Sequence, residues 1–185
     1  LTGEVGTGKT TIVRSLLEQL PPDTRVALVL NPRLSPYEFL LAICEELRLP
    51  LSLEQRDSMK AIVDALNQRL LEAHAQGQRV VLIVDEAQNL SPDVLEQIRL
   101  LTNLETAKQK LLQIILIGQP ELRARLERKE LRQLRQRITV RYHLGPITRQ
   151  ETASYIQHRL LIAGSNGRPT FSRPAYWAIH RYAGG

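Results

Sequence analysis

The stretch that decides the fold is residues 3–10, Gly3-Glu4-Val5-Gly6-Thr7-Gly8-Lys9-Thr10, which matches the Walker A phosphate-loop pattern G-x-x-x-x-G-K-[ST]. The glycines allow backbone conformations that are closed to other residues, so successive N–H groups can turn inward around a phosphate. A helix beginning near Lys9 would direct its N–H groups and the positive end of its dipole at the same anion. The alternative, a glycine-rich turn before a helix, is disfavoured because every fixed position matches.

The residue types in this loop predict a nucleotide and a metal ion as ligands. Lys9 would reach the β- and γ-phosphates, and the hydroxyl of Thr10 would ligate Mg²⁺. We expect the nucleotide to contact the loop from Gly3 to Thr11. No N-K-x-D-like guanine signature occurs in the sequence, which favours ATP as the nucleotide.

A second motif follows the apolar segment 79–84 (R-V-V-L-I-V), which predicts a buried strand ending in Asp85 and Glu86. Ligands in α/β sheets bind beyond the carboxyl ends of the strands, where this Walker B pattern places both carboxylates. Asp85 would hold Mg²⁺ together with Thr10. Glu86 would orient and deprotonate the attacking water, so we expect hydrolysis of ATP to ADP and phosphate. The structural alternative is that both acids cap a helix starting near Ser91.

Two further polar residues follow predicted strands. Gln119 comes after the strand at 111–117 and could position water or sense the γ-phosphate, although a plain turn before Pro120 explains it equally well. Asn31 follows the strand at 25–30 and could hydrogen-bond Glu86 until a partner binds. Asn before a proline is also an ordinary strand terminator.

Apolar strands alternate with helices along the chain, which predicts an α/β fold whose parallel sheet is covered on both faces. Strands are expected at 25–30, 79–84, 111–117 and 138–144, and helices at 10–20, 36–48, 52–77, 91–104 and 121–136. The helix at 52–77 would bury Met59, Ile62, Val63, Leu66 and Leu70.

The domain organisation follows from where this alternation stops. Only Leu1 and Thr2 precede the phosphate loop, so the first strand is expected to be largely missing. After Gly145 and Pro146 only helices are predicted. We therefore expect an N-terminally truncated ATPase core at 1–145 and a partial helical lid at 146–185.

Composition excludes several classes of protein. The single cysteine, Cys44, rules out an internal disulfide framework and lies in an apolar segment, which predicts a packed core thiol. The longest apolar runs, such as 80–84 and 114–117, are too short to cross a bilayer, and no signal peptide is recognisable. We expect a soluble cytoplasmic domain.

The formal net charge of +6 is concentrated in residues 121–141, the basic segment, which has eight Lys or Arg against three acids. Three interpretations remain open. The segment could be a solvated helix face, it could contribute one arginine to a neighbouring subunit's γ-phosphate, or it could bind DNA phosphates. No helix-turn-helix, aromatic platform or zinc spacing accompanies it, so we rank DNA below the first two.

The sequence resembles AAA+ ATPases of the additional-strand, catalytic-glutamate class, and more narrowly the general secretion pathway A proteins (GspA/ExeA) and their relatives in exosortase-linked loci. The resemblance rests on five segments: L-T-G-E-V-G-T-G-K-T (1–10), L-N-P-R-L-S (30–35), V-D-E-A-Q-N-L-S (84–91), I-L-I-G-Q-P-E-L (115–122) and L-R-Q-R-I-T-V-R-Y-H-L (134–144). The first and third are common to many ATPases. Gly118–Glu121 and Gln136–Ile138 are more particular to this group.

The resemblance implies a sheet order of 5-1-4-3-2, sensor 1 at Gln119, and a homo-oligomer with an arginine finger in trans. The finger would be Arg137, with Arg132 and Arg135 as rivals, and the sensor 2 arginine would lie beyond Gly185. The implied function is a motor or switch that energises assembly of a secretion or export apparatus at the bacterial inner membrane, with an inner-membrane partner protein. Two alternatives are a DNA-associated AAA+ ATPase, of the transposition target-selection or initiator type, and a scaffold that binds ATP without turnover.

Overall fold

A computed structural model describes residues 1–30, 32–107 and 109–184, so Asn31 and its predicted role lie outside the described residues. The chain forms two compact units, Leu1–His143 and Leu144–Gly185. The elements, in chain order, are β1 (Thr2–Gly3), α1 (Lys9–Gln19), β2 (Thr24–Val29), α2 (Pro36–Glu46), α3 (Leu53–Arg56), α4 (Met59–Ala75), β3 (Arg79–Val84), the 3-10 turn η1 (Ala87–Asn89), α5 (Pro92–Leu101), β4 (Gln113–Leu116), α6 (Pro120–Leu126), the 3-10 turn η2 (Lys129–Leu131), α7 (Arg132–Arg137), β5 (His143–Leu144), α8 (Arg149–Ile162) and α9 (Arg173–Ala183).

The sheet of the first unit is parallel where its register is defined. Strands β2, β3 and β4 pair in that order, with Thr24 opposite Arg79 and Val81 opposite Gln113. Strand β1 joins beyond β4 through a parallel bridge between Thr2 and Gly118, and on its other side it neighbours β5. The resulting order, 5-1-4-3-2 with a first strand of only two residues, confirms the fold prediction.

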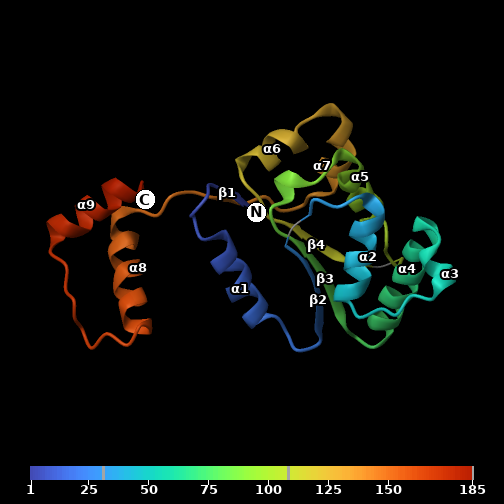
Figure 1. The fold of residues 1–185 in the computed structure, drawn as a ribbon, viewed down its shortest axis with the longest axis horizontal. Coiled ribbons are helices and arrows are strands. Elements are labelled where there is room, and N and C mark those ends of the chain that lie inside the picture. The colour runs from blue at the N-terminus through green and yellow to red at the C-terminus, as the bar shows by residue number, and fades with distance from the viewer. Residues whose placement is uncertain (31, 108, 185) are drawn as a thin grey trace. The chain divides into compact units, whose positions relative to one another are not determined.

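The side chains of each strand point alternately to the two faces of the sheet, and each face has its own hydrophobic core (Figure 1). On one face Val81 and Ile83 pack against Val13 of α1. On the other face β-strand residues such as Leu82 pack against α2, α4 and α5. Successive residues of a strand point to opposite faces, so these continuously apolar strands need helices on both.

The predicted core thiol lies in the larger of these two cores. Cys44 is buried, and loss of hydration raises its pKa to about 11. The thiol therefore stays neutral at ordinary pH, in agreement with a packing role.

The helix predicted at 52–77 is interrupted, which corrects the sequence interpretation. Ser52 caps the short α3, with its hydroxyl accepting from the Gln55 N–H, and Ser58 caps α4 by accepting from the Ala61 N–H. Two capping serines six positions apart begin two helices instead of one. Met59, now at the first position of α4, is exposed and does not belong to the buried face.

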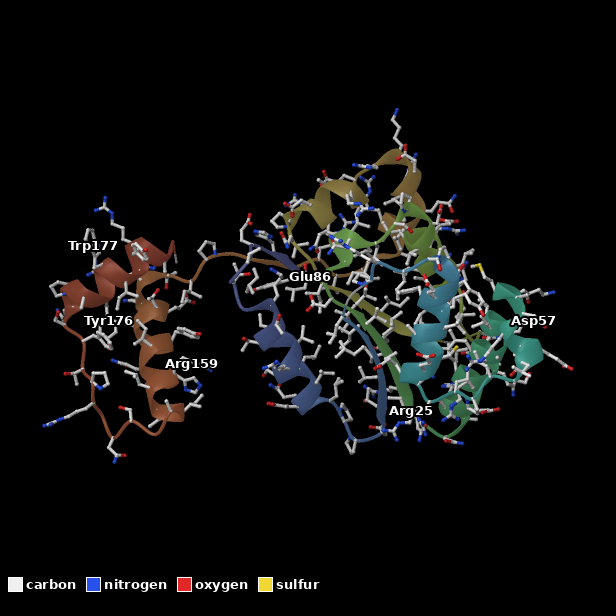
Figure 2. The ribbon with its side chains drawn as sticks, viewed as in Figure 1. Arg25, Asp57, Glu86, Arg159, Tyr176 and Trp177 are labelled. Carbon is white, nitrogen blue, oxygen red and sulfur yellow. The ribbon has the colours of Figure 1, made fainter. Side chains whose placement is uncertain are left out.

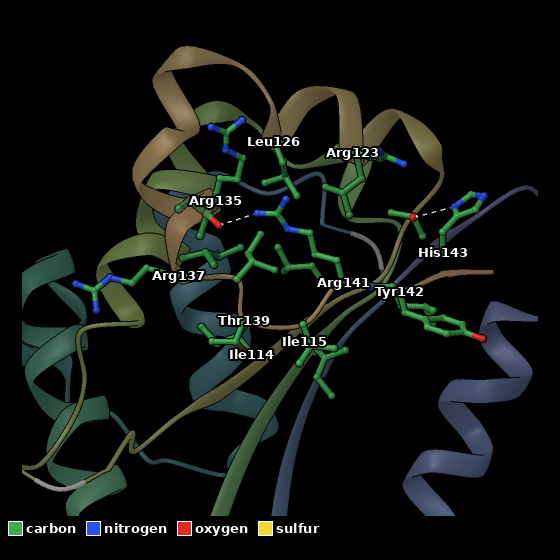
Figure 3. Close-up of a pocket in the computed structure, with 18 of the residues that line it drawn as sticks. Ile114, Ile115, Arg123, Leu126, Arg135, Arg137, Thr139, Arg141, Tyr142 and His143 are labelled. Carbon is green, nitrogen blue, oxygen red and sulfur yellow. Dashed lines mark hydrogen bonds between the residues drawn. The ribbon is translucent and has the colours of Figure 1, made fainter. Parts of the chain in front are cut away.

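The strand predicted at 138–144 is also wrong for most of its length, since the strand β5 comprises His143 and Leu144 alone among these described residues. Its expected neighbour β1 has two residues, and one of these, Thr2, donates its N–H to the carbonyl of Tyr142 at 2.9 Å. A cavity of about 660 Å³ lies between residues 138–142 and the side chains of β4, including Ile114 and Ile115 (Figure 3).

The second unit contains the two predicted helices, α8 and α9. Thr148 begins α8 with a capping box, in which its N–H donates to Glu151 Oε2 at 2.6 Å. The buried Thr152 hydroxyl lies 2.9 Å from Nδ1 of His180 on α9. That this unit acts as a lid stays a prediction. Among the residues that the structure describes, no helix combines the length and hydropathy needed to span a bilayer.

Candidate nucleotide-binding site

The phosphate loop connects β1 to α1 and has the backbone conformation that its glycines predict. Gly6 and Gly8 have φ values of +84° and +89°, in the left-handed region that other residues rarely adopt. A Cβ atom at either position would meet open space, so these glycines are needed for conformation and not for room. Gly8 also forms the N-cap of α1, and it has no side chain with which to cap the helix.

Lys9 is held in the loop by two backbone carbonyls. Its Nζ donates to the carbonyl oxygens of Gly3 and Glu4, each at 2.7 Å, and the residue is 8% exposed. The first turn of α1 contains no acidic residue that would compete for this cation. A buried ammonium beside an uncapped helix N-terminus is an arrangement that suits a phosphate group.

Asp85 and Glu86 follow β3 directly, at the carboxyl end of the sheet. Asp85 is buried, its N–H donates to the carbonyl of Val29 at 2.9 Å, and its Oδ1 accepts from the Glu86 N–H at 2.8 Å. Glu86 has φ +51°, a left-handed conformation that costs a non-glycine residue about 1–2 kcal/mol. Figure 2 shows Glu86 at the end of the strands that lies nearest to β1.

The Glu86 carboxylate is hydrogen-bonded by two side-chain amides. Its Oε2 accepts from Gln88 Nε2 at 2.5 Å and from Gln119 Nε2 at 3.4 Å. The structure therefore brings the predicted residue Gln119 to the predicted base. Sequence reasoning did not identify Gln88, because a polar residue two positions after the acid has no helical or strand periodicity to mark it.

The basic segment is more than a solvated face, which corrects one interpretation of its arginines. Arg125 of α6 donates from Nη2 to the carbonyl of Leu90 at 2.5 Å and from Nη1 to the carbonyl of Gln88. One guanidinium thus binds both ends of the turn that follows Glu86. Arg123, two positions earlier, does fit the interpretation of a solvated helix face. Its side chain is exposed and forms an ion pair with Glu127 at 3.5 Å.

Arg137 lies at the end of α7, and in Figure 3 its side chain extends away from the other labelled residues. A hydrogen bond from Lys110 lowers the pKa of Glu105, and the charge of Arg137 acts in the same direction. The guanidinium is exposed and near Glu105, so the structure does not direct it at the Walker residues of its own chain.

Comparison with known families matches residues 1–126 to a family model described as an AAA domain. The chain belongs to the AAA domain family. Over all 185 residues this AAA domain is 51% identical to the General secretion pathway protein A of Aeromonas hydrophila, which confirms the resemblance predicted from the sequence. The chain spans about a third (33%) of the length of that relative.

Solved structures support the same fold for the AAA domain. Cdc6p of Pyrobaculum aerophilum superposes with a TM-score of 0.65 at 20% identity, covering 87% of this chain and 42% of that one. A Walker-type ATPase of Pyrococcus abyssi superposes with a TM-score of 0.63 at 16% identity, covering 97% of this chain and 56% of that one. At such low identities the likeness establishes the P-loop ATPase fold alone.

The residues predicted to bind a metal ion have the chemistry that suits Mg²⁺ in a nucleotide complex. Within the described residues, no group of three or more His, Cys, Asp or Glu side chains is placed to hold a metal on its own. Mg²⁺ commonly binds through one or two protein oxygens, retained waters and substrate phosphates. The carboxylate of Asp85 and the exposed hydroxyl of Thr10 supply hard oxygen ligands of that kind.

Proposed function

We propose that this AAA domain binds ATP·Mg²⁺ and hydrolyses it, with Glu86 as the general base. The observation that carries the proposal is the arrangement at the carboxyl end of the sheet. Asp85 and Glu86 are the two residues that directly follow β3. Gln119, which lies beyond the end of the neighbouring β4, donates a hydrogen bond to Glu86. Parallel strands end at the same edge of a sheet, where ligands of such folds bind.

Each side chain then has a defined task. Lys9 exchanges its two loop carbonyls for phosphate oxygens and balances their charge. Thr10 and Asp85 hold Mg²⁺, which when bound draws charge from the phosphates. The Oε2 atom of Glu86 accepts hydrogen bonds from the amides of Gln88 and Gln119. Its other carboxylate oxygen, Oε1, accepts a proton from the attacking water.

Hydrolysis in this proposal is completed between subunits. Arg137 is exposed and lies near Glu105, which suits a guanidinium that reaches the γ-phosphate of a neighbouring copy in a homo-oligomer. Arg132 and Arg135 on the same helix are the rival fingers. Of these, Arg135 is partly buried, and its carbonyl accepts a hydrogen bond from Arg141, so it is the less free to move.

The 51% identity to General secretion pathway protein A supports a role for the whole protein in secretion. We propose that ATP turnover in this cytoplasmic domain energises assembly of a secretion or export apparatus at the bacterial inner membrane, through an inner-membrane partner protein. Conformational change would pass through the second unit as a lid.

A DNA-associated ATPase is the second candidate, favoured by the charge of the basic segment. Arg128, Lys129 and Arg132 are exposed and available to phosphates, whereas Arg125 is engaged by the turn after Glu86. DNA binding through about six phosphate contacts would weaken by roughly 10³-fold or more between 50 and 200 mM salt. Absence of such binding excludes this candidate.

Phosphate release by the full-length protein tests the main proposal. Glu86→Gln should retain ATP binding and release phosphate at least about 10²-fold more slowly, which is typical for the loss of a general base. Glu54→Gln, on the exposed α3, is the matched control and should behave as the wild type. Equal rates for Glu86→Gln and the wild type would remove Glu86 as the base.

Activity that rises more than linearly with protein concentration would support a finger in trans. ATP binding without phosphate release at any concentration would favour the scaffold alternative.

A further inference from the structure

Gln88 connects Glu86, the proposed general base, to Gln119 at the end of β4. Its Nε2 donates to Glu86 Oε2 at 2.5 Å, and its Oε1 accepts the backbone N–H of Gln119 at 3.1 Å. These partners fix the orientation of the amide, because a carboxylate requires a donor and a backbone N–H requires an acceptor. A rotated amide would break both hydrogen bonds at once.

The backbone around Gln88 is built for this contact. A Cβ atom on Gly118 would lie 2.7 Å from Gln88 Oε1, so only glycine leaves room for the amide at the end of β4. From the other side, Arg125 binds the carbonyl of Gln88 itself. The side chain of Gln88 is therefore held by the turn after β3 and by the end of β4, and its backbone is held by α6.

We propose that Gln88 is a positioning residue for hydrolysis, which holds the Glu86 carboxylate against Gln119 with one oxygen turned toward the attacking water. This role rests on the proposed function of Glu86. Glu86 has three side-chain torsions, and of its two side-chain partners among the described residues Gln88 is the nearer, at 2.5 Å against 3.4 Å for Gln119, so the direction of its carboxylate depends mainly on Gln88. Without that bond the carboxylate rotates away from the water without affecting the phosphate loop.

The test is Gln88→Met in the full-length protein, because methionine has a similar length and neither hydrogen-bonding group. Misplacing a catalytic group by about 1 Å can reduce the rate by about 10²-fold. We expect kcat to fall by about 10- to 100-fold. Both the KM for ATP and the affinity for a fluorescent ATP analogue should stay within about threefold of the wild-type values. The substitution leaves unchanged the interactions that bind the ground state and the transition state equally. Asn89→Ala, in the same turn with an exposed side chain, is the control and should keep the wild-type kcat.

A second substitution reaches the same amide from the other side. Gly118→Ala should lower kcat in the same way as Gln88→Met, because the added methyl group displaces Gln88 Oε1. Urea denaturation of both variants separates this effect from unfolding.

A residue that acts through Glu86 has no further effect once Glu86 is replaced. In single-turnover assays with radiolabelled ATP, Gln88→Met should therefore lower the rate of ATP hydrolysis when it is introduced into the wild-type protein. The same substitution introduced into Glu86→Gln should leave the residual rate unchanged. An additional loss in the Glu86→Gln background would overturn the positioning role, as would a wild-type kcat for Gln88→Met. If Glu86→Gln itself hydrolyses ATP at the wild-type rate, Glu86 is not the general base and the proposed function is wrong. This outcome is distinct from one in which Glu86 is the base and Gln88 does not position it.

Discussion

Replacing Arg125 by methionine tests how the turn after Glu86 is held in place. The substitution keeps most of the aliphatic stem and removes the guanidinium that binds the carbonyls of Gln88 and Leu90. Leu90 is fully buried, and Gln88 is partly buried, so at least one of these carbonyls loses a partner that water does not easily replace. The effect should therefore appear in the stability of the turn and in catalysis together.

The size of the effect follows from the two hydrogen bonds. A hydrogen bond to a charged group contributes about 1.5–3 kcal/mol, and we take the lower value for each because Arg125 is only partly buried. The expected loss is about 3 kcal/mol in the free energy of unfolding, or roughly a hundredfold in the folded-to-unfolded ratio.

Urea denaturation and hydrogen exchange measure this loss in the full-length protein. Arg125→Met should lower the denaturation midpoint and speed exchange of the Asn89 N–H, which donates to the Glu86 carbonyl at 2.8 Å. Arg123→Met is the matched control, since its 74% exposed side chain forms one surface ion pair, and it should change the free energy of unfolding by less than about 0.5 kcal/mol. Equal midpoints for the two variants would refute the assignment of Arg125 to the turn.

Two further outcomes are expected. Arg137→Ala should lower ATP hydrolysis by about 10³-fold or more without weakening ATP binding, and mixing it with Glu86→Gln subunits should restore activity; a mixture no more active than its parts would contradict a finger in trans. Cys44 should resist iodoacetamide at pH 8 in the folded protein, because its pKa of about 11 leaves the thiol protonated, and should react once urea unfolds the chain.

Much of the fold was predictable because its signals are local. The continuous apolar run at 79–84 predicts a strand buried on both faces, and Val81 and Leu82 do pack on opposite sides of the sheet. The helix expected from residue 36 does begin there, because Ser35 forms a capping box at the start of α2. The Walker A spacing carries its own backbone requirement, seen in the positive φ values of Gly6 and Gly8.

The errors arise where tertiary context decides the outcome. Residues 138–142 have strand-forming side chains, but a strand also needs a hydrogen-bonding neighbour, and in the described part of the chain the strand β5 that pairs with β1 is His143–Leu144. The contribution of Arg125 depends on which carbonyls a folded turn presents, and no sequence spacing encodes that. Gln88 contacts Gln119 across 31 positions of sequence, through space that only Gly118 leaves open.

Calorimetric titration with ATP·Mg²⁺ measures whether the phosphate loop binds the nucleotide. We expect that the full-length protein binds ATP and that Lys9→Ala weakens binding by about 10- to 100-fold, because it removes a charge-assisted hydrogen bond to phosphate. Lys60→Ala, on the exposed surface of α4, should bind as the wild type does. No binding at millimolar ATP, or equal affinity for the wild type and Lys9→Ala, would show that the phosphate loop does not bind ATP as proposed.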